Sequence, residues 1–310
     1  MTTYQDDHPQ PLMKHPTMTI GYYPGCSLKG TAKEYDRSLR AILGALGVEL
    51  REIEDWNCCG ASSAHAVSRL LATALPARNI NLAAAQNYGE ILAPCAACYN
   101  RLVAAKREIE QHAAVRQSVE YVLEEPFRPG VEIRNLIEFF ERIGTETIAA
   151  AVRRPLQGLS AACYYGCLLV RPPEITRFDD AETPSSMERI VQATGAKTVE
   201  WRFKTECCGA AHSIARKDIV LDLSRQILDD ARASGADLIV VACPMCHSNL
   251  DMRQASMRVR NGGRRSVPVV YLSELVGYAL GFDARTLGLD LHFIDPAPAL
   301  AKVQGKEVPA

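Results

Sequence analysis

The sequence predicts an α/β protein of two homologous halves, each a small parallel sheet with helical crossovers, related by a pseudo-two-fold axis. Two observations support this fold class. Short apolar runs alternate with amphipathic runs along the chain, and a cysteine pattern in the first half returns in the second. The domain assignment is a disordered extension at 1–18, a first cysteine-rich half at 19–148, a second at 149–290 and a flexible tail at 291–310.

In the first half, strand-like apolar runs are separated by segments with helical spacing. The segment 33–46 is a predicted helix because Leu39, Ile42 and Leu43 fall on one face and Gly47 ends it. The predicted elements are a strand at 19–23, that helix, a strand at 48–53, a helix at 67–86, a strand at 89–93 and a helix that starts near residue 95.

The second half repeats this order after a predicted linker at 145–156. Its predicted elements are a strand at 159–164, a helix at 186–194, a strand at 197–201, a helix at 214–233 and a strand at 237–242. Strand–helix alternation of this kind implies right-handed crossovers between parallel strands. We therefore expect one parallel sheet in each half.

Ten of the eleven cysteines form one pattern that is present twice: a single Cys, a Cys-Cys-Gly triplet and a Cys-x-x-Cys pair. The members are Cys26, Cys58, Cys59, Cys95 and Cys98, and then Cys167, Cys207, Cys208, Cys243 and Cys246. Each cluster follows a predicted strand, and loops after parallel strands gather at the carboxyl edge of a sheet. We expect each set of five to converge on one site, with Gly25, Gly60, Gly166 and Gly209 in turns of positive φ or in close contact with a bound group.

The residues alone leave the metal open. Cys-x-x-Cys is a common zinc half-site, but tetrahedral zinc takes four ligands and each half offers five thiols. Adjacent cysteines reach two irons of one cluster more naturally than they close a single tetrahedron. All-thiolate ligation suits iron–sulfur clusters as well as zinc. Redox-active thiols without a metal are the third alternative.

Composition and charge bear on the partners and the cellular location of the protein. A formal net charge of -1 gives no sign of a nucleic-acid or anionic-membrane partner. No apolar run approaches the roughly 18 residues that span a bilayer, and residues 1–18 lack the apolar core of a signal peptide. We therefore expect a cytoplasmic protein. Structural disulfides are rare in that reducing compartment, so a repeated cysteine pattern there indicates metal binding or catalysis.

The doubled pattern resembles the cysteine-rich CCG domain, and two in tandem are similar to the family of B-type subunits of heterodisulfide reductase, over about residues 20–282. This resemblance implies two noncubane four-iron four-sulfur clusters with the ten cysteines above as ligands; zinc in one half is the alternative. Related domains occur in iron–sulfur subunits of lactate, glycolate, glycerol-3-phosphate and succinate oxidation systems. Several of those carry ferredoxin-type cysteine runs, which this chain lacks.

The resemblance also implies a function: reduction of a small disulfide between the two clusters, or thiol oxidation in reverse. No Gly-x-Gly-x-x-Gly follows a predicted strand, so electrons must come from other subunits. The family supplies them through a ferredoxin-type iron–sulfur subunit (C-type) and a flavin-containing subunit (A-type). The alternatives are an electron-relay subunit of a lactate-, glycolate- or succinate-type oxidoreductase and a zinc-stabilised scaffold.

Proton donors for such a reaction are sought near the ligands. His247 directly follows Cys246, and Tyr99 holds the matching place after Cys98. His212 and His65 follow the Cys-Cys pairs at slightly greater distance. Histidine has a suitable pKa for proton transfer, but each of these could equally be a structural or surface residue. Cys163, the eleventh cysteine, is expected to be a buried thiol outside the pattern.

Overall fold

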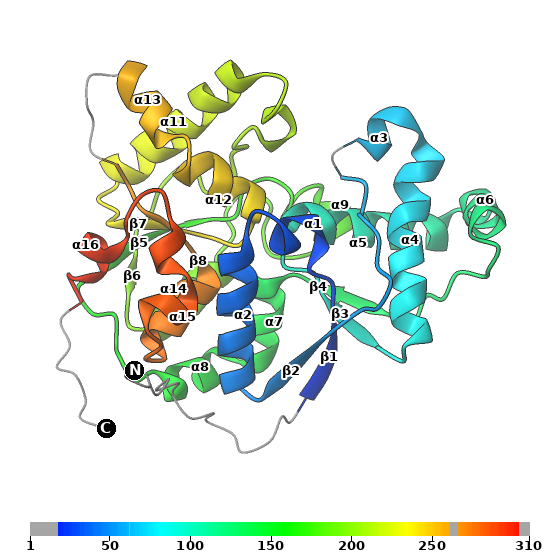
Figure 1. The fold of residues 1–310 in the computed structure, drawn as a ribbon, viewed down its shortest axis with the longest axis horizontal. Helices are drawn as coiled ribbons and strands as arrows, with labels where there is room; N and C mark the ends of the chain where they lie inside the picture. The colour runs from blue at the N-terminus through cyan, green and yellow to red at the C-terminus, as the bar shows by residue number, and fades with distance from the viewer. Residues whose placement is uncertain (1–17, 62, 261–265, 304–310) are drawn as a thin grey trace, which may run out of the picture.

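The computed structural model describes residues 18–61, 63–260 and 266–303. This part of the chain contains two four-stranded sheets, one in each half (Figure 1). The first sheet has the strand order β2-β1-β3-β4, and the second has the order β6-β5-β7-β8. The second order repeats the first, so the prediction of an α/β protein with two homologous halves is confirmed.

Every strand pair in the two sheets is parallel. The strands are β1 Met18–Tyr22, β2 Val48–Glu52, β3 Glu90–Leu92, β4 Glu132–Arg134, β5 Ser160–Tyr164, β6 Lys197–Thr198, β7 Leu238–Val241 and β8 Val269–Tyr271. In each half the chain runs from an inner strand to one edge and then crosses to the other side. The direction of winding therefore changes between β1 and β3, and between β5 and β7, where α/β sheets open a binding crevice at their carboxyl ends.

Helices connect the strands and cover the sheets (Figure 1). In the first half they are α1 Gly25–Lys29, α2 Lys33–Ala45, α3 Ala64–Val67, α4 Arg69–Ala85, α5 Ala96–Gln111, α6 Ala113–Leu123, α7 Leu136–Ile143 and α8 Thr145–Ala151. In the second half they are α9 Pro173–Thr176, α10 Ser186–Ala193, α11 Lys217–Ala233, α12 Pro244–Asp251, α13 Gln254–Arg260, α14 Leu272–Ala279, α15 Ala284–Leu287 and α16 Ala297–Leu300, with 3-10 turns η1 Ala210–His212 and η2 Leu289–Leu291.

Local sequence explains where the main helices begin and end. Helix α2 buries Leu39, Ile42 and Leu43 on one face, as predicted. Helix α7 starts at a capping box: the Asn135 side chain accepts the Glu138 N–H at 3.0 Å, and Glu138 accepts the Asn135 N–H at 2.9 Å. The predicted helix at 67–86 is confirmed as α4, which begins two residues later than expected because Ser68 takes an extended conformation and caps it by accepting the Leu71 N–H.

The two halves dock through helix pairs that repeat by pseudo-symmetry. Helix α2 of the first half packs on α14 of the second, and α10 of the second packs on α7 of the first. At the α2–α14 contact, a Cβ on Gly277 would lie 2.9 Å from Ile42, so only glycine permits this approach. The Ser38 and Ser273 hydroxyls form a buried hydrogen bond of 2.7 Å across it. The predicted linker begins with α8, which packs on α7 and α10.

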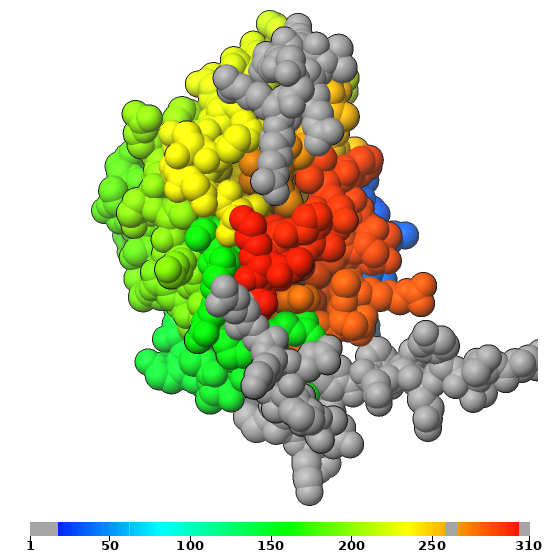
Figure 2. Space-filling model, turned by 90° about the vertical axis from the view of Figure 1, so that its left-hand side faces the viewer, coloured from blue at the N-terminus to red at the C-terminus, as the bar shows by residue number. Residues whose placement is uncertain are grey.

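Residues 291–303 are folded, whereas the sequence led us to expect a flexible tail. The Asp251 carboxylate accepts the backbone N–H groups of Phe293 at 2.7 Å and Ile294 at 3.1 Å, and Leu300 on α16 is buried. Figure 2 shows this segment, in red, lying against the body of the protein. The partners that anchor it lie far back in the chain, where sequence periodicity cannot reveal them. The rest of the predicted termini, 1–17 and 304–310, lies outside the described residues.

The Ser38–Ser273 hydrogen bond tests how tightly the halves are coupled. We expect Ser38→Ala to lower the free energy of unfolding by about 1–3 kcal/mol, because it leaves the buried Ser273 hydroxyl without its partner. Adding Ser273→Ala should cost little more, since both polar groups are then gone. Urea unfolding of the single and double variants checks this. Ser118→Ala on exposed α6 is the control, and additive single effects would contradict the coupling.

Candidate metal centre

All ten patterned thiols lie in loops or helix starts at the carboxyl ends of strands. Cys26 follows β1, the Cys58–Cys59 pair follows β2 and Cys95 follows β3. Their counterparts follow β5, β6 and β7 in the same way. The single cysteines and the Cys-x-x-Cys pairs thus flank the points where each sheet reverses its winding direction. The predicted convergence has its structural basis in this topology.

The first group of thiols is closely packed. The Cys59 and Cys98 sulfurs are 3.4 Å apart, and the Gly60 N–H donates to the Cys58 sulfur at 3.4 Å. Cys59, Cys95 and Cys98 are buried, whereas Cys26 and Cys58 are exposed. The group therefore has a protein-covered side and a side that faces solvent.

The second group repeats this geometry. The Cys208 and Cys246 sulfurs are 3.6 Å apart, and the Gly209 N–H donates to the Cys207 sulfur at 3.3 Å. Cys208, Cys243 and Cys246 are buried, Cys167 is half-buried and Cys207 is exposed. Two separate stretches of sequence thus build nearly the same five-thiol arrangement.

The two groups meet at Cys95 and Cys243, which come from different halves. The neighbouring Cys243 side chain raises the pKa of Cys95. Hydrogen bonds from Cys246 and then from Cys95 lower the pKa of Cys243. The Tyr35 hydroxyl of α2 lies 3.5 Å from the Pro94 carbonyl and 3.4 Å from the Ala242 carbonyl, next to both cysteines. The two groups therefore lie next to each other at the junction of the halves.

Hydrogen bonds between neighbouring thiols lower the pKa of the accepting cysteine and raise the pKa of the donating one, as at Cys98 and Cys246. Cys59 accepts from Cys58 and Cys98, which lowers its pKa to about 3. Cys207 accepts from Cys167 and from backbone N–H groups, which lowers its pKa to about 6. A donor set made only of close-packed sulfurs fits a thiolate-bound metal or iron–sulfur cluster.

Glycines give the sulfurs the space they need. All four predicted positions have positive φ: Gly25, Gly60, Gly166 and Gly209. A Cβ on Gly25 would lie 2.9 Å from the Cys98 sulfur, and one on Gly166 would lie 3.0 Å from the Cys246 sulfur. Any larger residue would thus occupy space next to a ligand sulfur.

A tyrosine in each half fixes the Cys-Cys loop. The Tyr23 hydroxyl donates to the Asn57 carbonyl at 2.7 Å, and the Tyr164 hydroxyl donates to the Glu206 carbonyl at 2.6 Å. Each carbonyl belongs to the residue just before the Cys-Cys pair, and each tyrosine lies three residues before the single cysteine. The sequence analysis missed this role, although the repeated Tyr-x-x-Cys spacing was a visible signal.

Charged and amide groups near the buried sulfurs were also missed. Arg101 on α5 lies near Cys59, and its positive charge favours that thiolate. Asn249 on α12 donates to the Cys208 sulfur at 3.5 Å. Both residues come three positions after the last cysteine of their pattern, one helical turn away on the same face. Equal spacing was the signal that could have identified them.

The four predicted proton donors lie in different surroundings. His65 and His212 are exposed, and the charge of His212 acts on Cys207. Tyr99 is buried, and its hydroxyl donates to the Thr176 carbonyl at 3.2 Å. His247 is buried, its ring stacks on Tyr271, and its Nε2 lies 3.0 Å from the Val269 carbonyl. Burial lowers the pKa of His247 to about 3, so its imidazole is neutral.

Cys163 lies within β5 and is fully buried. Burial raises the pKa of its thiol, and its carbonyl accepts the Trp201 indole N–H at 3.1 Å. Cys163 is therefore a buried, protonated thiol outside the cysteine pattern, as the sequence led us to expect.

Comparison with known proteins gives consistent results. Residues 20–103 and 161–251 each match the family described as the cysteine-rich domain, CCG. A Wolinella succinogenes protein named 8-methylmenaquinol:fumarate reductase membrane anchor subunit is 34% identical, over 89% of this chain and 97% of that protein. A Methanosarcina mazei protein, named as the B-type subunit of a ferredoxin:CoB-CoM heterodisulfide reductase, is 30% identical, over 92% of this chain and 96% of that protein.

The fold is also found among solved structures. A hypothetical protein from Helicobacter pylori superimposes with a TM-score of 0.73, at 14% identity, over 90% of this chain and 52% of that chain. Its likeness supports the architecture alone. Among the helices in the described part of the chain, none has the length and apolar character needed to cross a bilayer.

The glycines beside the sulfurs permit a direct test. We expect Gly25→Ala to displace the Cys98 sulfur and to remove the metal of the first half only, because both the Cβ contact and the positive φ oppose alanine. Gly166→Ala should do the same to the second half. Metal per chain measures both effects. Gly44→Ala is the control, since its Cβ would meet nothing within 4 Å; equal metal loss there would contradict the steric argument.

Glu138, next to Tyr99, should make stability depend on pH. Burial raises the pKa of this carboxyl from 4.5 to about 7. The folded protein then binds a proton that the unfolded chain releases, so stability falls as pH rises from about 4.5 to about 7. We expect the free energy of unfolding of Glu138→Gln, minus that of the wild type, to be about 2 kcal/mol larger at pH 8 than at pH 5. Urea unfolding at several pH values checks this; a pH-independent difference would contradict it.

Proposed function

This chain belongs to the family of B-type heterodisulfide reductase subunits with tandem cysteine-rich domains, and we propose that it acts on a small disulfide within an oxidoreductase complex. Membership of this family makes the chain an iron–sulfur subunit of an oxidoreductase. The proposed reaction is the reduction of the disulfide to two thiols, or the oxidation of two thiols in reverse. The proposed cofactors are two noncubane four-iron four-sulfur clusters, one in each five-thiol group.

The observation that carries the proposal is the junction at Cys95 and Cys243. Breaking a disulfide takes two electrons and produces two thiolates, so it suits two redox sites that lie next to each other. Tyr35 lies beside the residues that precede Cys95 and Cys243, so the two thiol groups are neighbours, and each group has an exposed cysteine. When bound, the clusters would supply the electrons and the Lewis-acidic irons.

A different polar side chain lies near the buried sulfurs in each half, and each can alter a reduction potential. The positive charge of Arg101 acts on Cys59, whereas the neutral amide of Asn249 donates to Cys208. Charge and hydrogen bonds near cluster sulfurs alter reduction potentials. We therefore infer that the two halves have different potentials and that electrons enter at one of them.

Of the four candidate proton donors, His212 is the one that the geometry favours. It is exposed, it lies on η1 directly after the second Cys-Cys-Gly triplet, and its charge acts on Cys207. His65 occupies a comparable exposed place in the first half. Tyr99 and His247 instead direct their polar atoms at backbone carbonyls.

Partners are proposed from the family and from the surface near the thiols. We propose docking of a C-type ferredoxin-like subunit, fed by an A-type flavin subunit. Two apolar side chains lie exposed in the segments after the Cys-Cys pairs: Val67, the last residue of α3, at 77% and Ile214 at 100% exposure. Exposed apolar groups of this kind are typical of interaction sites. All eleven cysteines are free, which suits the reducing environment of the cytoplasm, our proposed location.

A second candidate function rests on the Wolinella relative, whose printed name places it in a quinol:fumarate reductase. In such a complex the clusters would only relay electrons and would bind no disulfide. The zinc-stabilised scaffold is the third alternative. The experiments below separate the three.

The first experiment measures iron, zinc and acid-labile sulfide in protein purified without oxygen. We expect about eight irons with matching sulfide. Cys59→Ala and Cys208→Ala should each remove about half of the iron, because each thiol belongs to one group. Cys163→Ala is the matched control, a buried thiol outside both groups, and should change nothing. Zinc in place of iron would contradict the redox proposal.

The second experiment asks whether the centre binds sulfur substrates. EPR spectra of the oxidised protein are recorded with a small disulfide, with its thiols and with a thioether of the same size. We expect the thiols and the disulfide, but not the thioether, to change the spectrum. Unchanged spectra in all cases would favour the electron relay.

A further inference from the structure

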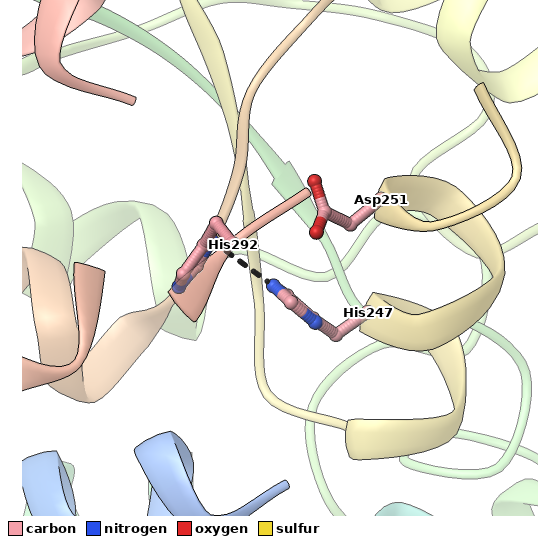
Figure 3. Close-up of side chains that lie close together, drawn as sticks. All are labelled: His247, Asp251 and His292. Carbon is pink, nitrogen blue, oxygen red and sulfur yellow. Dashed lines mark hydrogen bonds between the residues drawn. The ribbon is translucent and has the colours of Figure 1, made fainter. Parts of the chain in front are cut away.

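A second cluster of ligand-type side chains lies outside the ten-thiol centre. His247 and Asp251 are one turn apart on α12, so they face the same side, and His292 meets them from the C-terminal segment. Figure 3 shows the three side chains pointing toward one another. One ligand atom from each lies within 4.8 Å of the others. All three side chains are buried or nearly so.

The polar atoms in this cluster are spaced as a metal would hold them. His247 Nε2 and His292 Nδ1 are 3.3 Å apart, and they lie 3.0 and 2.9 Å from the Val269 carbonyl oxygen. Ligand atoms about 2.0–2.1 Å from a tetrahedral zinc are separated by about 3.3 Å. The triangle formed by the two nitrogens and the oxygen is thus close to one face of such a site. Asp251 can add a ligand only through the lone pairs that remain after its oxygens accept the Phe293 and Ile294 N–H groups.

The contacts of His292 leave room for either a second proton or a cation beside its Nδ1. The Glu274 carboxylate lies 3.0 Å from His292 Nε2, so that nitrogen carries the proton. The Nδ1 lone pair of a neutral His292 would then face the lone pairs of the Val269 oxygen at 2.9 Å. Only a second proton or a cation relieves this repulsion.

Glu274 has the position expected of a carboxylate that orients a metal-bound histidine. Such histidines usually donate their other ring N–H to a carboxylate, which fixes the tautomer and makes the ligand more basic. Glu274 is fully buried and is itself held by the Tyr271 N–H at 2.8 Å. The carboxylate is therefore placed by the fold and not by chance contact.

The first half lacks this cluster although it shares the framework. Glu138 stands where Glu274 stands, but Tyr99 and Val103 occupy the places of His247 and Asp251. Asp251 also anchors the C-terminal segment, but that role does not require two histidines that face each other. Their presence in the second half alone indicates a separate role.

We propose that His247, Asp251 and His292 form a binding site for a divalent cation of the zinc type, which joins the C-terminal segment to α12. Two imidazoles with oxygen donors suit such a cation. The cation takes the place of the second proton on His292. Because His247 directly follows the cluster ligand Cys246, the cation also holds α12 in position beside the thiol centre.

Zinc binding to the full-length protein tests this proposal. The chain, purified without oxygen and with its iron in place, is incubated with zinc, dialysed and analysed for metals and by X-ray absorption at the zinc edge. We expect about one zinc per chain with nitrogen and oxygen neighbours at about 2.0–2.1 Å and no sulfur at about 2.3 Å. This result needs no variant. It is also independent of the disulfide proposal, which rests on iron.

Variants assign the ligands. Asp251→Asn and His292→Gln should each lower bound zinc at least about tenfold, as expected when a ligand is removed, and leave iron and sulfide unchanged. His212→Gln, an exposed histidine of the same half, is the control and should retain zinc. The proposal is overturned if the wild type retains no zinc, if sulfur appears among the zinc neighbours, or if both variants retain zinc as the wild type does.

Discussion

The rest of the structure depends on one geometric constraint: a parallel sheet delivers the residues after its strands to a single edge. Each half uses the same strand order, so each places its thiols around the point where the winding reverses. Docking of α2 on α14 and of α7 on α10 then brings the two edges together. The proximity of Cys95 to Cys243 follows from this docking, and it places the two thiol groups side by side.

The two halves have the same glycines beside their sulfurs but different polar side chains near their buried thiols. Gly25 and Gly166 keep nearly equal distances to their sulfurs, because a Cβ at either position would displace a ligand. Around the buried sulfurs, by contrast, Arg101 in one half corresponds to Asn249 in the other. A full charge and a neutral amide stabilise a thiolate to different degrees, so a duplicated scaffold can hold two sites that are not electrically equal.

Much of the fold could be predicted because its signals are local. Apolar periodicity placed α2 within one residue, and the strand-like runs before the cysteines were correctly identified. The misses depend on distant contacts. Residues 291–303 lack a strong pattern of their own and are held by Asp251 and Glu274, which lie earlier in the chain. Ser68 sets the start of α4 two residues later than expected because its side chain caps that helix, a choice that periodicity does not report.

The sequence by itself determined the duplication, the α/β class and the ten thiols with their glycines, because spacing, period and residue type are written along the chain. Only the tertiary structure decided which thiols touch across the halves, which sulfurs Arg101 and Asn249 influence, and that His292 reaches α12. These are contacts between residues up to about 150 positions apart. They depend on how two sheets and their helices pack, and packing direction is a property of the assembled surfaces.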